Sequence, residues 1–135
     1  MENAKPYMIE RIVAALSYPT MGMAGFIWLI LGLLTKARLR PFMQYHIFQS
    51  IFISIALILI QMLLGILINI ISIVPFINTL VLNIVMLLNM PLLFNLSIIQ
   101  LLVSLLITYL GITAFLGFYS YIPYISEIIS QNTRR

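Results

Sequence analysis

Few side chains of this 135-residue sequence can take part in acid-base, nucleophilic or metal chemistry. It has no cysteine, a single histidine, and three acidic residues, Glu2, Glu10 and Glu127, all near the chain ends. Metal clusters, thiol chemistry, paired carboxylates and Ser-His-Asp triads all need residues that are missing here. We therefore expect a protein without enzymatic activity, cofactor or metal, and without disulfides.

The single histidine, His46, lies near the start of a long stretch without Asp, Glu, Lys or Arg. A proton relay within a membrane needs a second ionisable group at depth. None of Asp, Glu, Lys or Arg occurs between Pro41 and Ser126, a run of 86 residues. We expect His46 to form a hydrogen bond to a neighbouring helix or to a lipid headgroup.

The charge pattern indicates a membrane protein. The mean hydropathy is +1.15 and only 7% of residues are charged, whereas a soluble domain carries about 25% charged residues. The net charge of +4 comes from small basic groups beside apolar runs. Such groups are typical of the flanks of membrane helices and not of a phosphate-binding surface. We therefore expect the protein to lie in a lipid bilayer and to bind neither nucleic acid nor a small-molecule substrate.

Apolar runs of sufficient length predict an all-α integral membrane protein, a bundle of four transmembrane helices in one membrane domain over residues 1–135. The expected helices span 12–34, 47–71, 77–93 and 96–119, and an interfacial C-terminal tail follows over 120–135. About 20 helical residues cross the hydrocarbon layer. Two alternatives stay open: Pro19 splits the first run into an interfacial turn and a crossing part, and the third helix is short or re-entrant.

Lys36, Arg38 and Arg40 form the densest basic group. By default they set topology, and they are also candidates for contact with anionic lipid or an acidic partner. With four full spans, these three residues lie on one side of the membrane and the four basic residues of the two tails lie on the other, so the count does not decide the orientation. If the third segment is re-entrant, the basic loop and the two C-terminal arginines share one side, which then has five basic residues against two on the other. The sequence therefore leaves the orientation open.

Two of the expected helices carry polar side chains on one side, within about 100° of arc. These residues are His46, Ser50, Ser54 and Gln61 on the second helix, and Ser97, Gln100, Ser104 and Thr108 on the fourth. Polar groups in lipid need partners, so the stripes predict either hydrogen bonds between helices or the lining of a water-filled path. The first helix carries Gly22, Gly25 and Gly32 on one face, which predicts close docking of another helix.

Three stretches of the sequence are similar to the Tic20 family, small four-helix membrane proteins of plastids and cyanobacteria. They are RIVAALSYP at 11–19, LTKARLRPFMQYHIFQS at 34–50 and FYSYIPYISE at 118–127. The resemblance implies four transmembrane helices and a non-enzymatic core subunit of the protein-import translocon of the inner chloroplast envelope. It also implies that the partners are other membrane subunits of the translocon.

The first predicted span begins close to residue 1, with no transit peptide before it, so we expect a plastid-encoded or a cyanobacterial protein. The expected location is the plastid inner envelope membrane or the cyanobacterial plasma membrane. Two further functions remain open: a structural or assembly subunit of another membrane complex, such as a photosynthetic one, and a channel-forming oligomer.

Overall fold

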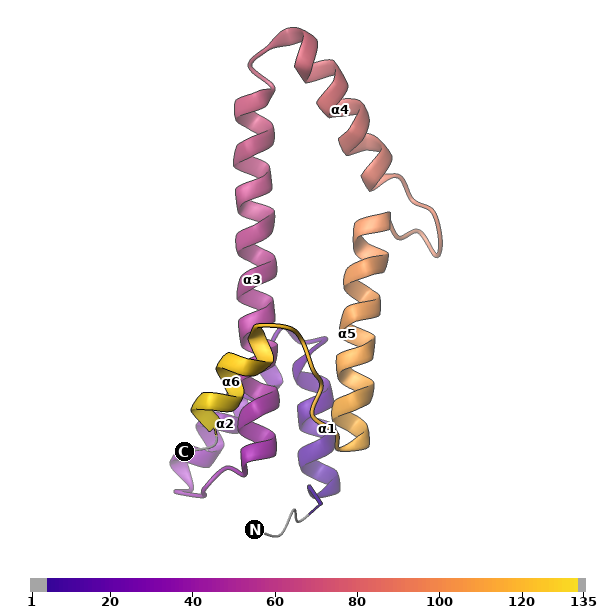
Figure 1. The fold of residues 1–135 in the computed structure, drawn as a ribbon. Helices are drawn as coiled ribbons and strands as arrows, with labels where there is room; N and C mark the ends of the chain where they lie inside the picture. The colour runs from indigo at the N-terminus through magenta and orange to yellow at the C-terminus, as the bar shows by residue number, and fades with distance from the viewer. Residues whose placement is uncertain (1–4, 134–135) are drawn as a thin grey trace. The chain divides into compact units, whose positions relative to one another are not determined.

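The computed structural model describes residues 5–133, which fold into helices joined by short turns (Figure 1). The helices are α1 (Met8–Ser17), α2 (Met23–Leu34), α3 (Pro41–Ile71), α4 (Pro75–Asn89), α5 (Ile98–Leu116) and α6 (Ile125–Thr133). An isolated bridge joins Leu93 and Leu96. The described chain is therefore all-α, as the sequence predicts.

Two of these helices are long and apolar enough to cross a bilayer. The most apolar window of α3 has a mean hydropathy of 2.9 and that of α5 has 2.1. Only 6% of this window of α3 and 11% of that of α5 is buried inside the protein, whereas the core helix of a soluble protein is mostly buried. Pro41 and Pro75 occupy the first turns of α3 and α4, where the missing N–H of proline costs no helical hydrogen bond.

The chain divides into two compact units, and each is described by itself. The first contains the described parts of residues 1–55 and 107–135, and the second contains residues 56–106. The first unit therefore includes α1, α2, the N-terminal part of α3, the C-terminal part of α5, and α6. In this unit α1, α2 and α6 gather around α3 (Figure 1).

In the first unit, α1 and α2 form a hairpin beside the start of α3. The segment at the start of α1 contacts Arg40, and Tyr18, just after α1, bonds to residues 46 and 49 of α3. The backbone approaches Ile51 at Gly22, before α2, and Leu39 at Gly32, near the end of α2. The hairpin thus returns to the level at which it began, after rising about 16 Å along α3 at 1.5 Å per residue.

The turn of the hairpin lies where the sequence prevents a continuous helix. Pro19 has no N–H to donate to the preceding turn of helix. Met21 and Gly22 adopt positive φ angles of 53° and 86°, and the Gly22 N–H closes the turn on the carbonyl of Ser17. The range 12–34, expected as one helix with a split at Pro19 as the alternative, is therefore divided into α1 and α2.

The second unit contains the C-terminal part of α3, α4 and the first turns of α5. A tight turn at Phe94 and Asn95, both with positive φ, leads into α5. Ser97 and Gln100 cap α5 reciprocally: the Ser97 N–H donates to Gln100 Oε1 at 3.0 Å, and the Gln100 N–H donates to Ser97 Oγ at 3.3 Å. This capping box satisfies two N–H groups that have no partner inside the helix.

The remaining helix ends differ from the expected ranges by a few residues. α3 begins at Pro41 and not at 47, because Phe42, Tyr45 and His46 belong to its first turns. α4 ends at Asn89, two residues before Pro91, and α5 spans 98–116 instead of 96–119. The tail, which was expected to be interfacial, contains α6. Residues 134–135, the last two of the chain, lie outside the described part.

Candidate functional site

A buried polar cluster lies in the first unit at the start of α3. We call it the motif core, and it consists of Tyr18, Tyr45, His46, Gln49, Ser120 and Ser126. Each of these residues is at most 5% exposed. They come from three separate parts of the chain: the turn after α1, the first turns of α3, and the segment from the end of α5 to the start of α6.

Gln49 is the centre of the motif core. Its Oε1 accepts hydrogen bonds from the Tyr18 hydroxyl and from Ser120 Oγ, each at 2.7 Å. Its Nε2 donates to the Ser120 carbonyl and to Ser126 Oγ, each at 3.4 Å. One side chain of α3 therefore holds both the α1–α2 turn and the segment before α6.

Tyr45 and His46 attach the chain after α5 to α3. The Tyr45 hydroxyl donates to the carbonyl of Ser120, and His46 Nε2 lies 3.1 Å from the carbonyl of Phe118. Aromatic rings surround these bonds: Phe42 packs edge-on against His46 with centroids 4.6 Å apart, and Tyr119 packs edge-on against Tyr45 at 5.0 Å. Such pairs stabilise a packed cluster beyond the apolar area they bury.

The Tyr18 hydroxyl lies 2.7 Å from both His46 Nδ1 and Gln49 Oε1. It has one hydrogen, and the Phe118 carbonyl beside Nε2 can only accept. In a neutral His46, the tautomer decides whether Nδ1 accepts this hydrogen or donates its own to the Tyr18 oxygen, which leaves the Tyr18 hydrogen for Gln49 Oε1. The tautomer of His46 therefore decides which hydrogen bonds Tyr18 makes inside the motif core.

Tyr18 lies in the turn between α1 and α2, outside the two long apolar helices. Burial in the motif core raises the pKa of its phenol, because the charged form loses its hydration there. The Tyr18 hydroxyl therefore stays protonated and remains able to donate. No titration of this group disturbs the motif core at physiological pH.

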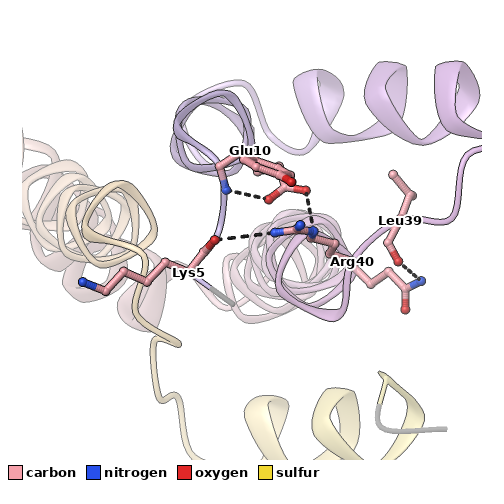
Figure 2. Close-up of polar contacts among 6 residues, drawn as sticks. Lys5, Glu10, Leu39 and Arg40 are labelled. Atoms are coloured by element: carbon pink, nitrogen blue, oxygen red, sulfur yellow. Dashed lines mark hydrogen bonds and ion pairs between the residues drawn. The ribbon is translucent and has the colours of Figure 1, made fainter. Parts of the chain in front are cut away.

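Arg40, predicted to contact lipid or a partner, is engaged inside the first unit. Figure 2 shows its guanidinium between the carboxylate of Glu10 and the carbonyl of Lys5. Arg40 Nε lies 3.8 Å from Glu10 Oε1, Nη1 donates to the Lys5 carbonyl at 3.5 Å, and the Tyr7 ring lies 4.0 Å below. Glu10 also accepts the Tyr7 N–H at 2.9 Å. The basic loop is therefore fixed to the N-terminal segment, while Lys36 and Arg38 are exposed.

The three glycines predicted to dock a helix all lie at close approaches within the first unit. A Cβ on Gly22 would lie 2.7 Å from Ile51 Cγ1, and one on Gly25 would lie 2.9 Å from Ile47 Cγ1. A Cβ on Gly32 would lie 3.1 Å from Leu39 Cδ2. Gly22 and Gly25 thus bring α2 against α3 of the same chain.

The polar stripes have different surroundings along their length. His46 belongs to the motif core, whereas Ser50 and Ser54 donate to carbonyls of their own helix at 2.9 and 2.8 Å. Ser97 and Gln100 form the cap of α5. The side chains of Gln61, Ser104 and Thr108 are exposed.

Sequence reasoning missed four residues of the motif core as site residues: Tyr18, Gln49, Ser120 and Ser126. Tyr45 was missed in the same way. The signal was present, because all six residues lie within the three stretches that carry the family resemblance. Reading helix faces one at a time could not show that these stretches meet.

Comparisons with models of known families, with curated proteins and with solved structures give no match to this chain.

Proposed function

We propose that the chain is an integral membrane protein in which α3 and α5 cross the bilayer. Apolar side chains along both helices are exposed, among them Leu63, Leu67, Leu102 and Leu105, each more than half exposed. A surface of this kind in water exposes far more apolar area than a soluble protein tolerates. Lipid or partner subunits would cover it.

In this arrangement the α1–α2 hairpin enters from one side and returns to it. Its rise of about 16 Å is half the hydrocarbon thickness of about 30 Å. The N-terminal segment, the loop 35–40 and the segment before α6 then share one side. All five described basic residues, Lys5, Arg11, Lys36, Arg38 and Arg40, belong to that side, and the segment 72–97 between the crossing helices has none. The positive-inside rule assigns it to the cytoplasm or stroma.

We further propose that the protein is a non-enzymatic subunit of a protein translocon of the Tic20 type, in the plastid inner envelope or the cyanobacterial plasma membrane. One observation carries this proposal: all three stretches similar to that family contribute to the motif core. That the residues of all three stretches build one buried cluster supports this proposal. The first unit would anchor the subunit, and the exposed faces of α3 and α5 would meet partner subunits or the translocated chain.

Isolation of the tagged protein in mild detergent tests this function. The membranes come from plastids or cyanobacteria and contain a precursor arrested in transit. We expect co-isolation with translocon subunits, and cross-linking of the precursor to a cysteine probe at Gln61→Cys. The matched control is Leu59→Cys, which lies about 200° around the same helix and should label lipid. Co-isolation with photosystem or respiratory complexes, with no precursor cross-link from either position, would contradict the proposal.

A second function, an assembly subunit of another membrane complex, has one observation in its favour. Asn69 and Asn89 donate to carbonyls of their own helices at 2.9 Å each. These amides satisfy part of their bonding without water, so a water-filled path is not needed to explain them. The isolation experiment separates the two functions.

A further inference from the structure

A cavity outside the motif core lies where the N-terminal segment meets the end of α5. Its volume is about 350 Å³, and it is lined by Lys5, Pro6, Arg11, Leu116, Gly117 and Phe118. Two of these six residues are cationic, and no acidic residue is among them. The neighbouring acid, Glu10, is already paired with Arg40 and the Tyr7 N–H. Within the described residues 5–133, the cavity lining therefore carries two cationic side chains and no acidic one.

Arg11 is held in position at this cavity. Its Nε donates to the carbonyl of Phe115, and its guanidinium lies 5.7 Å from the centroid of the Phe115 ring. The bond to Phe115 uses only Nε, and the two terminal nitrogens carry the other four N–H donors of the guanidinium. An ordered guanidinium with donors to spare recognises phosphate oxygens well.

Gly117 allows the close packing beside Arg11. Its φ of 84° suits glycine, and a Cβ there would lie 3.3 Å from Pro6 Cγ and 3.4 Å from Arg11 Nε. The neighbouring Leu116 and Phe118 are 52% and 65% exposed. Cationic groups thus lie directly beside exposed apolar side chains at the end of a long apolar helix, which matches the junction of headgroup and acyl chain in a lipid.

We propose that this cavity binds the phosphate group of an anionic phospholipid, with Lys5 and Arg11 contacting the phosphate and with Leu116 and Phe118 along the acyl chain. A zwitterionic lipid fits less well, because its cationic headgroup would lie near Lys5 and Arg11. The inference requires the membrane location but not the translocon function. A lipid at this site would tie the N-terminal segment to the end of α5.

Native mass spectrometry of the full chain in detergent tests this site, with phosphatidylglycerol as the probe. We expect Lys5→Gln to lower phosphatidylglycerol binding about fivefold, the effect of one cationic side chain at a lipid surface. Lys36→Gln removes the same charge from an exposed position outside the cavity and should change binding by less than twofold. Fluorescence of Trp28, the single tryptophan, shows whether each variant is folded as the original chain is.

Two competition arms identify the source of the phosphate. We expect phosphatidylcholine to bind more weakly than phosphatidylglycerol, and excess inorganic phosphate to leave the bound lipid in place. Equal losses in Lys5→Gln and Lys36→Gln would overturn the site, because bulk charge would then explain binding. Displacement of the lipid by inorganic phosphate, with the same dependence on Lys5, would overturn the lipid as the ligand.

Discussion

Gln49 and Gln61 are two glutamines of the same helix with opposite surroundings. Gln49 is fully buried and bonds to Tyr18, Ser120 and Ser126, whereas Gln61 is exposed. In the sequence they look alike, and only Gln61 falls on the polar stripe expected for a helix over 47–71. The stripe was drawn from residues of one helix, while the bonding of Gln49 depends on segments more than 25 positions away in the chain.

We predict that Gln49→Leu destabilises the first unit and that Gln61→Leu does not. Loss of the Gln49 amide leaves buried donors and acceptors without partners, at a cost of about 2–3 kcal/mol in the free energy of unfolding. The change at Gln61 should stay within about 0.5 kcal/mol. Denaturation in mixed micelles, followed by Trp28 fluorescence, measures both. Equal stability of the two variants would mean that the motif core does not hold the unit together.

The α1–α2 hairpin depends on its glycines and on Pro19. The sequence showed a glycine face and a proline within one apolar run. In the structure the proline lies at the turn, Gly22 and Gly25 lie against α3, and Gly32 lies against Leu39 of the basic loop. Length and hydropathy alone favour a continuous helix over 12–34, because they are blind to backbone angles. The positive φ angles at residues 21 and 22 are what reverse the chain.

Gly25 and Gly65 give a matched test of this hairpin. A Cβ at Gly25 would lie 2.7 Å from Ser17 Oγ and 2.9 Å from Ile47 Cγ1, whereas a Cβ at Gly65 would meet nothing within 4 Å. Gly25→Ala should lower the free energy of unfolding by about 1–2 kcal/mol, because overpacking outweighs the better helix propensity of alanine. Gly65→Ala should raise it by up to about 1 kcal/mol. The same unfolding assay decides, and a stabilised Gly25→Ala would show that α2 does not pack tightly on α3.

For the whole molecule, the sequence predicted the all-helical class and the basic loop, but not the side on which each segment lies. Charge counting left the side of each segment undecided, because it treated residues 12–34 as one continuous helix. Within the first unit, Arg40 contacts the N-terminal segment and His46 contacts Phe118, and these contacts bring the three segments together at the start of α3. Neither kind of contact can be read from hydropathy, because each joins segments more than 30 residues apart in the chain.

The most direct test of this account is the sidedness of single cysteines in a chain that has none of its own. Met8→Cys, Lys36→Cys and Tyr124→Cys report on the two tails and the basic loop, and Phe94→Cys reports on the turn before α5. In sealed vesicles treated with a membrane-impermeant maleimide, we predict that the first three react from one side and Phe94→Cys from the other. Reaction of Met8→Cys and Lys36→Cys from opposite sides would contradict the hairpin and restore a first membrane span over 12–34.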